Sequence, residues 1–582
     1  DELLRTTSYS SFDPKNRKFR FESSQGFRKP LRQTDAVALC PKVASNYDQI
    51  AREYQASKLQ PWRTHIERHT LLRLTGKVAG LRALDLACGE GYYTRLLRRL
   101  GAGPVTGVDL SQGMIDLARA QEAKEPLDVQ YHAADARAVD QRQGNDLVFA
   151  AYLLWRANIW GILVAADPTG ITLMDPAQPQ DLEAIQAWSA ASGTPAEVVE
   201  NQLWLTTVAE WEAFKTGRKE LRMEYWYRRV RSARGWLMEE SAGKSEPIGG
   251  TWNLDKENRK RLAPGTDVPA PLYGTVTPLV QSVIDEVRGE SSTLFGESTT
   301  LIWPTTRREA LAALNAFCDE RLANFGPYED AMSKEHEHLF HSLLSPALNL
   351  GLITPAEVCE RALQTYAERS SEIPLSSIEG FIRQILGWRE FMRHAYREYW
   401  REWQTDNGLD AHEDLPELYW SGETKMACMS RIVNTLQRTG HVHHIERLMV
   451  LGNFALLFGV QPQQVDAWFL EAFVDALPWV VTPNVVAMSQ FADLGRITSK
   501  PYICGGAYIS RMGDDCKSCF YNPTESVGEE ACPFTTLYWE FIDRHSARFA
   551  KNPRMATQVR SWSARPEGVR KEILVRAADV RS

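Results

Sequence analysis

Residues 376–393, SSIEGFIRQILGWREFMR, are the part of the sequence that decides the fold of this chain. Large apolar side chains recur in this stretch at helical spacing and continue one turn beyond it. They are Ile378, Phe381, Ile385, Trp388, Met392 and Tyr396. Arg383 and Arg389 interrupt the apolar stripe, and a cation beside such a stripe usually pairs with a carboxylate or holds a phosphate. The stretch therefore predicts a buried helix with two cations at its apolar face.

The chain around this helix is nearly all helical from about residue 291 to its end, and it carries a thiol-rich segment. Residues 502–534, YICGGAYISRMGDDCKSCFYNPTESVGEEACPF, place four cysteines in a stretch rich in Gly, Asp and Asn. The C-x-x-C pair lets two thiolates hold one metal centre, and a Cys-Pro step is common in iron–sulfur sites. Spacing alone selects Cys504, Cys516, Cys519 and Cys532 as ligands. It leaves zinc and an iron–sulfur cluster as alternatives.

Length and composition set the outer limits. A chain of 582 residues should hold two to four domains. A hydrophobic content of 43% and a charged content of 24% are those of a globular protein. The longest apolar run, residues 449–460, is too short to span a bilayer. Nine cysteines without a signal-like start predict a reducing, cytoplasmic environment, and we expect a monomer without membrane contact.

The sequence divides into regions of different character. We expect a polar tail at residues 1–44, a doubly wound α/β segment at 45–155, a further α/β region at 156–249, a linker at 250–290 and a helical domain at 291–582. The predicted strands are 84–87, 105–110, 129–133 and 147–152, with helices at 92–100 and 111–121. Two more short strands are expected within 162–175, and a helix at 181–190.

A glycine motif marks the first predicted strand–helix turn. Residues 84–97, LDLACGEGYYTRLL, place Gly89 and Gly91 where a backbone can approach a ligand closely. Asp109 and Asp135 follow the next two strands, where carboxylates can meet a ribose and an adenine. With YDQIAREY upstream, this set resembles the class I S-adenosylmethionine-dependent methyltransferases, which implies a remnant cofactor site. The alternative is tight-turn glycines and capping aspartates. Beyond Trp155 the resemblance ends, so we expect no methyl transfer.

The helical region resembles a second family. HSLLSPALNLGLIT, SSIEGFIRQILGWREFMR, HHIERLMVLGNFALL and TPNVVAMSQFAD, together with the cysteine segment, are similar to the photolyase/cryptochrome family. They resemble its iron–sulfur bacterial branch, which includes prokaryotic (6-4) photolyases. The resemblance runs from about residue 171 to 554. It implies an α/β domain joined to an all-helical domain that holds FAD, and DNA repair by light-driven electron transfer.

This resemblance also implies roles for single residues. A flavin pocket would include Ser342, Ser345, Glu379, Arg389, Asn453, Asp475 and Asn484. Trp420 and Trp468 match electron-relay positions, whereas Phe469 and Val481 depart from the family pattern. His443 and His444 match a position beside the lesion, and Tyr502 lies near the same pocket. Because adjacent helical side chains point to different faces, at most one of the two histidines should reach a substrate.

The family pattern also changes the expected ligand set of the metal centre. It implies that Cys428, Cys516, Cys519 and Cys532 hold a 4Fe–4S cluster and that Cys504 is not a ligand. The opening strand of the family's α/β domain, which binds a lumazine antenna in this branch, is replaced here by the methyltransferase-like segment, so we expect no lumazine. The two doubly wound halves are candidates for one hybrid sheet.

These observations predict a light-dependent DNA photolyase with (6-4) photoproducts in damaged DNA as substrate. The proton that (6-4) repair needs is the reason for that choice, because imidazole titrates near neutral pH. A blue-light-sensing cryptochrome without repair activity is the first alternative. An S-adenosylmethionine-dependent methyltransferase is the second.

Overall fold

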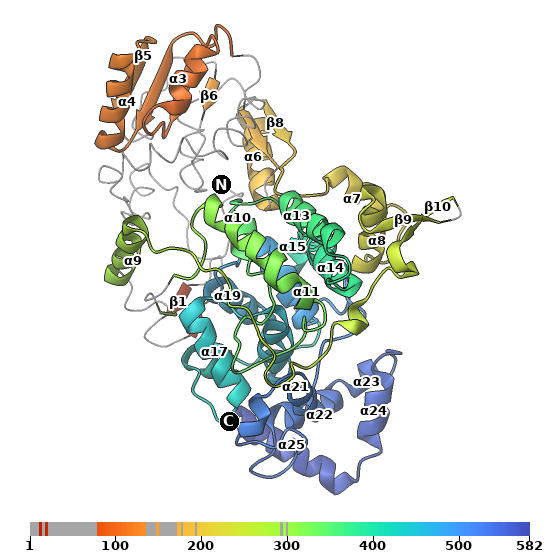
Figure 1. The fold of residues 1–582 in the computed structure, drawn as a ribbon. Helices are drawn as coiled ribbons and strands as arrows, with labels where there is room; N and C mark the ends of the chain where they lie inside the picture. The colour runs from red at the N-terminus through yellow and green to blue at the C-terminus, as the bar shows by residue number, and fades with distance from the viewer. Residues whose placement is uncertain are drawn as a thin grey trace. The chain divides into compact units, whose positions relative to one another are not determined.

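The computed structural model describes residues 11–13, 18–20, 78–134, 147–149, 171–175, 178–192, 195–241, 243–290, 295–297 and 301–582 (Figure 1). The chain forms two compact units. The first, the sheet unit, consists of Asp1–Ser11 and Arg20–Asn201, and the second, the helical unit, of Phe12–Phe19 and Gln202–Ser582. Most of the predicted tail and Asp135 lie outside the described residues. Two tail segments, β1 (Ser11–Asp13) and β2 (Lys18–Arg20), pair with each other.

The sheet unit contains a parallel four-stranded sheet with the strand order β5-β4-β3-β6. Its strands are β3 (Ala83–Leu86), β4 (Val105–Asp109), β5 (Val129–Ala133) and β6 (Leu147–Phe149), and the helices between them are α3 (Tyr92–Arg99) and α4 (Gln112–Lys124). All four residues of β3 are buried, as expected for a central strand of a parallel sheet. The predicted strands and helices of this segment are confirmed.

A second pair of strands in this unit is separate from that sheet. β7 (Ile171–Met174) and β8 (Ala196–Val199) pair in parallel around α6 (Pro179–Ser192). The sequence predicted β7 and α6 but not β8. Among the described strands, β7 and β8 pair only with each other, so these strands do not build the hybrid sheet that the sequence suggested.

The helical unit begins before the predicted boundary at residue 291. Its first elements are α7 (Val208–Lys215), α8 (Met223–Arg234), and the antiparallel hairpin of β9 (Met238–Ser241) and β10 (Lys244–Pro247). The predicted linker at 250–290 includes α9 (Pro278–Glu290). It also packs onto later helices, because Leu254 N donates to Glu379 Oε2 at 3.0 Å and the buried Asn258 donates to Glu329 at 2.8 Å. Buried hydrogen bonds of this kind fix the segment to the fold.

The rest of this unit is helical. It contains α10 (Arg307–Ala316), a π-helical turn (Phe317–Arg321), α11 (Leu322–Phe325), α12 (Ser345–Asn349), α13 (Pro355–Glu368), α14 (Leu375–Ile382), α15 (Glu390–Trp403), α16 (Leu418–Ser421), α17 (Ala427–Thr439), α18 (Asn453–Phe458), α19 (Pro462–Ala472), α20 (Pro478–Thr482), α21 (Gly506–Met512), α22 (Pro533–Arg544), α23 (Ser546–Phe549), α24 (Ala556–Ser563) and α25 (Glu567–Arg581). Every helix among the described residues is too short or too polar to cross a bilayer.

Three longer π-helical stretches interrupt or precede these helices. They are η6 (Arg383–Arg389), between α14 and α15, η7 (Glu446–Gly452), before α18, and η8 (Pro483–Ser489), after α20. The opening stripe therefore lies on one long helix whose middle is widened, which its apolar spacing did not predict. Five side chains of the stripe are buried, and Trp388 is partly exposed. π-Helical turns are rare and are often found at functional sites.

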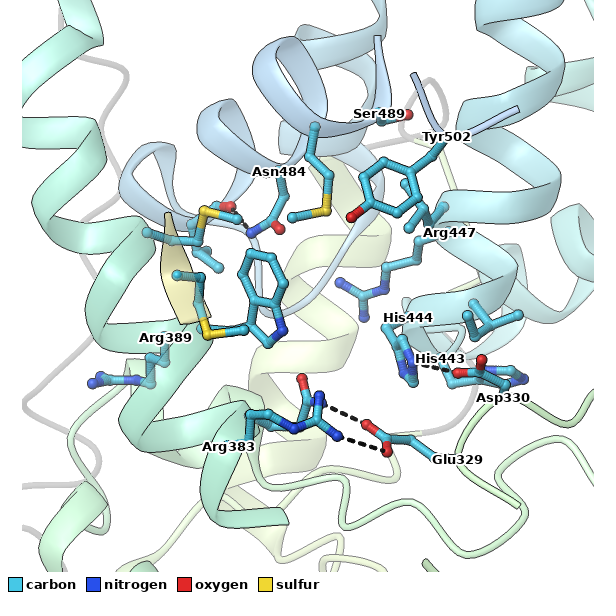
Figure 2. A pocket seen from close by; sticks show the side chains of 18 of the residues that line it. Glu329, Asp330, Arg383, Arg389, His443, His444, Arg447, Asn484, Ser489 and Tyr502 are labelled. Carbon is cyan, nitrogen blue, oxygen red and sulfur yellow. Dashed lines mark hydrogen bonds and ion pairs between the residues drawn. The ribbon is translucent and has the colours of Figure 1, made fainter. Parts of the chain in front are cut away.

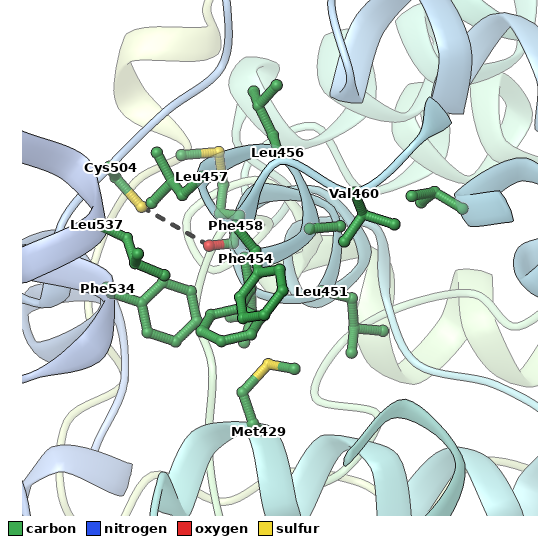
Figure 3. Packing of buried hydrophobic residues seen from close by; sticks show 14 of the residues in the cluster. Met429, Leu451, Phe454, Leu456, Leu457, Phe458, Val460, Cys504, Phe534 and Leu537 are labelled. Atoms are coloured by element: carbon green, nitrogen blue, oxygen red, sulfur yellow. Dashed lines mark hydrogen bonds between the residues drawn. The ribbon is translucent and has the colours of Figure 1, made fainter. Parts of the chain in front are cut away.

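The core of the helical unit surrounds α18 (Figure 3). The Phe454 ring contacts Phe458 and Phe534, with ring centroids 5.8 and 5.2 Å apart, and Leu451 and Met429 are fully buried beside them. Such aromatic side chains contribute most of the apolar area that a core buries. This core fixes α17, α18 and α22 against one another and so gives the neighbouring polar groups rigid supports.

Candidate functional site

A cavity of about 1130 Å³ lies in the helical unit (Figure 2). Residues from η6, η7 and η8 line it, together with the loop before α12 and the segment that leads to Cys504. Of the residues predicted for the site, the following line the cavity: Ser342, Ser345, Arg389, His443, His444, Asp475, Asn484 and Tyr502. Phe469 and Val481 line it as well. Residues as far apart in the sequence as Arg222 and Arg554 therefore line one cavity.

Arg447 and Asp475 form a bidentate ion pair in the cavity wall. Both guanidinium nitrogens of Arg447 donate to the Asp475 carboxylate, at 2.9 and 3.1 Å, and Ser345 Oγ donates to it at 2.7 Å. Although burial opposes the charged form, Arg447 and the hydrogen bonds lower the pKa of Asp475 to about 2. The carboxylate is therefore charged at neutral pH, and Arg447 is held at the cavity by a bidentate bond.

Arg383 is a second cation of the cavity, and Glu379 supports it from behind. Its Nε donates to Glu379 Oε1 at 3.2 Å, and its Nη2 makes no hydrogen bond within the described chain, 3.9 Å from Glu329 Oε2. Figure 2 shows Arg383 directed toward Glu329 at the edge of the cavity. Glu379 is fully buried and does not line the cavity, so it positions Arg383 and does not itself reach a ligand there.

Arg389 and Asn484 belong to the walls. Arg389 Cζ lies 4.4 and 5.1 Å from the ring centroids of Trp204 and Trp479. Figure 2 shows its guanidinium turned away from the cavity centre. Burial lowers the pKa of Arg389. Asn484 Nδ2 donates to Val480 O at 2.7 Å. Both side chains are thus fixed by neighbouring groups of the chain.

Asn453 lies outside the cavity and anchors one of its walls. Its amide donates to Cys504 O at 3.0 Å and to Cys504 Sγ at 3.3 Å, and Cys504 N donates back to Asn453 Oδ1 at 3.1 Å. Because Tyr502, Ile503 and Cys504 line the cavity, this paired contact holds their segment against the start of α18. Asn453 therefore acts on the site through the backbone of residues 502–504.

The two adjacent histidines have different surroundings. The His443 side chain is 2% exposed and stacks on His341, with ring centroids 4.6 Å apart. The His444 side chain is 44% exposed, and its Nε2 lies 3.5 Å from Asp330 Oδ1 (Figure 2). Burial lowers the pKa of His443 well below its usual range. Although burial also acts on His444, the bond to Asp330 raises its pKa. Only His444 is therefore suited to carry a proton at the cavity surface.

Sequence reasoning missed part of this polar wall. Arg447 and Asp330, and Arg383 as a cavity residue, were not predicted as site residues. Arg447 lies four residues after His443 and shares its motif, HHIER, so its helical spacing was an available signal. Asp330 comes from a distant loop, and only the fold brings it to His444.

The two predicted relay tryptophans lie on a path to the cavity. The Trp420 and Trp468 ring centroids are 6.5 Å apart, and Phe469 is 5.2 Å from Trp468. Trp468 is fully buried, and Phe469 lines the cavity. Phe469 lies between Trp468 and the cavity. Because phenylalanine is much harder to oxidise than tryptophan, Phe469 is a poor electron carrier.

The cysteine set is brought together by α17, a short 3-10 turn and α22. Cys428 lies in the first turn of α17, Cys516 and Cys519 lie at the turn Asp515–Ser518, and Cys532 caps α22. Burial, then Asp515 and the other three cysteines, raises the pKa of Cys428 well above its usual range. The other three predicted ligands thus lie near enough to Cys428 to affect its pKa.

Cys504 has different neighbours. Among these cysteines, its pKa is affected only by Cys532, and its thiol contacts Asn453 and Met449 O. Gly506 leaves room at Cys532, since a Cβ there would lie 2.8 Å from Cys532 Sγ. In the described part of the chain no three of these sulfur atoms lie within 4.8 Å of one another, as binding to one zinc ion at about 2.3 Å would require, so the four thiols suit a cubane cluster better by donor chemistry.

The sheet unit satisfies its predicted ligand residues internally. Both oxygens of Asp109 accept backbone bonds, from Gly89 N at 2.8 Å and Ser111 N at 2.9 Å. Gly91 has φ +82° and caps α3, and a Cβ there would lie 2.4 Å from the Tyr131 hydroxyl. The structure of the fold thus explains why a glycine and a carboxylate stand at these two positions, without a bound cofactor.

Two protein families match parts of the sequence. The family of deoxyribodipyrimidine photo-lyase-related proteins matches residues 127–303, and the methyltransferase domain family matches residues 83–163. The (6-4) photolyase of Agrobacterium fabrum is 38% identical over 413 residues, which cover 71% of this chain and 80% of that protein. The ubiquinone biosynthesis O-methyltransferase of Bradyrhizobium diazoefficiens is 40% identical over 73 residues, 12% of this chain and 28% of that protein.

Solved structures give matches of the same two kinds. A bacterial class III photolyase from Agrobacterium tumefaciens covers 85% of this chain and 92% of its own, at 16% identity and a TM-score of 0.40. A Synechocystis cryptochrome covers 84% and 94%, at 13% identity and a TM-score of 0.43. An S-adenosylmethionine-dependent methyltransferase from Mesorhizobium loti covers 14% and 38%, at 35% identity and a TM-score of 0.14.

Proposed function

Because the chain belongs to the photolyase family, we propose that it repairs (6-4) pyrimidine photoproducts in DNA in a light-dependent reaction. His444 carries the proposal. It is the cavity-facing member of the histidine pair, its side chain is 44% exposed, and Asp330 supports its protonated form. Repair of a (6-4) lesion needs a proton for the departing hydroxyl, and a positioned imidazolium is a suitable donor.

FAD, which family membership implies, fits the cavity by size and donor chemistry. A cavity of about 1130 Å³ exceeds the usual range for small ligands, which is about 300–1,000 Å³. Arg383 Nη2 is a buried donor without a hydrogen bond, and Arg447 lies on the same cavity. These two cations would hold the diphosphate. When bound and reduced, FAD supplies the electron that light transfers to the lesion and that returns after the bonds rearrange.

The damaged base would enter the cavity from the DNA helix, as it must in enzymes that act on single bases. Cations at the cavity supply attraction for the flanking phosphates. They are Arg222, Arg259, Lys500 and Arg554. Tyr502 lines the same cavity and is mostly buried, and burial raises its pKa, so it would contact the base as a neutral phenol. In this arrangement His444 donates the proton and Asp330 holds its ring.

The test compares His444→Ala with His443→Ala under blue light, with chemically reduced protein and an oligonucleotide that carries one defined lesion. We expect His444→Ala to retain flavin and DNA binding, whereas its rate of (6-4) repair should fall about 10²–10⁴-fold. His443→Ala should lose less, because its ring is buried against His341. Chemical reduction makes the assay independent of the Phe469 path.

Other outcomes would contradict parts of the proposal. Repair of cyclobutane dimers without repair of (6-4) lesions would contradict the proposal that (6-4) photoproducts are the substrate. Equal repair by His444→Ala and wild type would contradict the role of His444. Failure to repair either lesion with fully reduced flavin would favour the blue-light sensor.

The metal centre of this function is proposed for Cys428, Cys516, Cys519 and Cys532. The other three thiols lie near enough to Cys428 to affect its pKa, whereas Cys504 is bonded to Asn453. A 4Fe–4S cluster bound there would supply a redox-active, covalently held support for α17 and α22.

A further inference from the structure

Three histidines of the cavity wall form a compact cluster of nitrogen donors. One ring nitrogen each of His341, His443 and His444 lies within 4.8 Å of the others. His341 precedes α12, whereas the other two immediately precede η7. The His341 ring centroid lies 4.6 Å from that of His443 and 5.5 Å from that of His444. Two distant segments of the chain therefore bring three imidazoles to one place.

The protein itself leaves several of these nitrogens without partners. His341 Nε2 and both ring nitrogens of His443 are buried atoms with no hydrogen bond in the described chain. A buried polar atom without a partner destabilises the fold, and such atoms often mark a water or an ion. A simple packing role for these rings does not remove that cost, whereas a cation shared by one nitrogen of each ring would lower it.

Carboxylates lie behind two of the three rings. Asp330 Oδ1 is 3.5 Å from His444 Nε2, and Glu446 Oε2 is 3.5 Å from His443 Nε2. Glu446 is in turn held by Arg431 at 2.8 Å. In metal sites, a ligating histidine usually gives its second N–H to a carboxylate, which orients the ring and selects the ligating nitrogen. The same arrangement here would leave Nδ1 of both rings for a ligand.

We propose that His341, His443 and His444 form a binding site for one divalent ion of the zinc class. Imidazole nitrogen suits Zn²⁺ and its neighbours in the first transition series, whereas Mg²⁺ and Ca²⁺ take oxygen ligands. Three histidines with a fourth position open to solvent are a known zinc arrangement. The exposed edge of His444 leaves such a position on the cavity side.

This site is separate from the cysteine set. Its donors come from residues 341, 443 and 444, and the cysteine donors come from residues 428, 516, 519 and 532. The proposal also stands without the proposed repair function, since ion binding can be measured in the dark and without DNA. If both hold, a bound ion and a protonated His444 exclude each other.

The test is titration of the purified holoprotein with zinc chloride at pH 7.5, followed by calorimetry, with zinc-edge X-ray absorption of the loaded protein. We expect one ion per chain and nitrogen or oxygen neighbours at about 2.0–2.1 Å. His341→Asn and His444→Asn should each weaken zinc binding at least about 10-fold. Even the removal of a group that only supports a metal ligand usually weakens binding by that factor. His412→Asn is the control, because its side chain is 72% exposed.

Two results would overturn the site. One is zinc affinity within twofold of wild type in both His341→Asn and His444→Asn. The other is a sulfur shell at about 2.3 Å, which would place the ion on cysteine. Circular dichroism checks that the variants fold. If the buried His341→Asn variant fails to fold, the half-exposed His444→Asn decides the outcome alone.

Discussion

The two units of this chain treat ligand-like residues in opposite ways. In the sheet unit, the Asp109 carboxylate is bonded to Gly89 and Ser111, and the space beside Gly91 is filled by Tyr131. In the helical unit, Arg383 and His443 line a cavity with buried nitrogens that make no hydrogen bond. A glycine-and-aspartate motif can therefore persist as a folding element, whereas unsatisfied polar atoms around a cavity indicate a ligand.

The largest effect should come from the cysteine set of the helical unit. Cys428→Ala should abolish iron binding, because it removes a thiol whose pKa all three other proposed ligands lie near enough to affect. Cys504→Ala should leave the iron content unchanged, because that thiol contacts Asn453 and Met449. Iron analysis and the visible absorption spectrum of both purified variants measure this.

The reverse pattern, with iron lost from Cys504→Ala and kept in Cys428→Ala, would show that sequence spacing alone had selected the right ligands. It would also weaken the contrast between the units, since Cys504 would then be a ligand that looks internally satisfied.

A second test concerns buried charge away from the cavity. Arg431 bridges Glu446 at 2.8 Å and Asp515 at 2.7 Å, and both carboxylates are nearly inaccessible. Arg431→Met should cost about 3–5 kcal/mol of unfolding free energy, because it leaves two buried carboxylates without their cation. Urea denaturation followed by tryptophan fluorescence measures the loss. Lys571→Met, in an exposed pair with Glu567, should cost less than about 0.5 kcal/mol.

If Arg431→Met cost no more than Lys571→Met, internal ion pairs of the helical unit would be dispensable. Its unsatisfied cavity atoms would then be a weaker sign of a ligand.

The third test uses pH. The pKa of Asp475 lies at about 2 in the folded protein, against an ordinary value of 3.8. A lowered pKa stabilises the fold above the ordinary value, and the stabilisation disappears as pH falls from about 4 to about 2. Its size is about 2 kcal/mol. Asp475→Asn should therefore flatten the dependence of unfolding free energy on pH in this window, measured by urea denaturation between pH 6 and pH 2.

Asp319→Asn serves as the control, because its ion pair is exposed. An equal slope for Asp475→Asn and wild type would mean that solvent in the cavity screens the pair with Arg447 and that the cavity is wetter than its contacts suggest.

The last test concerns the sheet unit. Gly91→Ala should cost about 1–3 kcal/mol, because φ is +82° and the new Cβ would meet Tyr131. Gly80→Ala is a matched control, with φ +81° and open space around it. Hydrogen exchange of the amides in β3–β5 compares the two variants, and Gly91→Ala should lose more protection.

Ligand binding at the same glycine would break the comparison between the units. Protection of β3–β5 by S-adenosylmethionine in wild type, lost in Gly91→Ala, would show that the glycine serves a cofactor. We expect no such protection and no methyl transfer.

Much of the fold could be predicted from local patterns. The short apolar strand around Leu84, the glycine turn after it and the helix expected from residue 111 gave element positions within a few residues. β8, Ala196–Val199, could not be predicted, because its pattern of buried and exposed residues does not alternate and its only described partner is β7. The contacts of the predicted linker at 250–290 could not be predicted, because its hydrogen bonds use partners such as Glu379, far along the chain.

The candidate site could be predicted where family motifs marked it. Ser345, His444 and Asp475 line one cavity, and the contacts with flavin and lesion that the resemblance implied for them stay predictions. The different roles of these residues could not be predicted from the sequence. Adjacent histidines look alike until the fold places Asp330 beside one and His341 beside the other. Glu379 and Asn453 likewise turned out to support cavity residues from behind.

The three π-helical stretches have a consequence for how this chain tolerates length changes. Each residue of a helix turns the next by about 100°. Loss of one residue within η7 would therefore rotate α18 relative to His444 and would carry Asn453 away from Cys504, although no side chain had been changed. Insertions and deletions that surface loops tolerate should disrupt the cavity at 383–389, 446–452 and 483–489. In these stretches the number of residues constrains the structure as strongly as their identity.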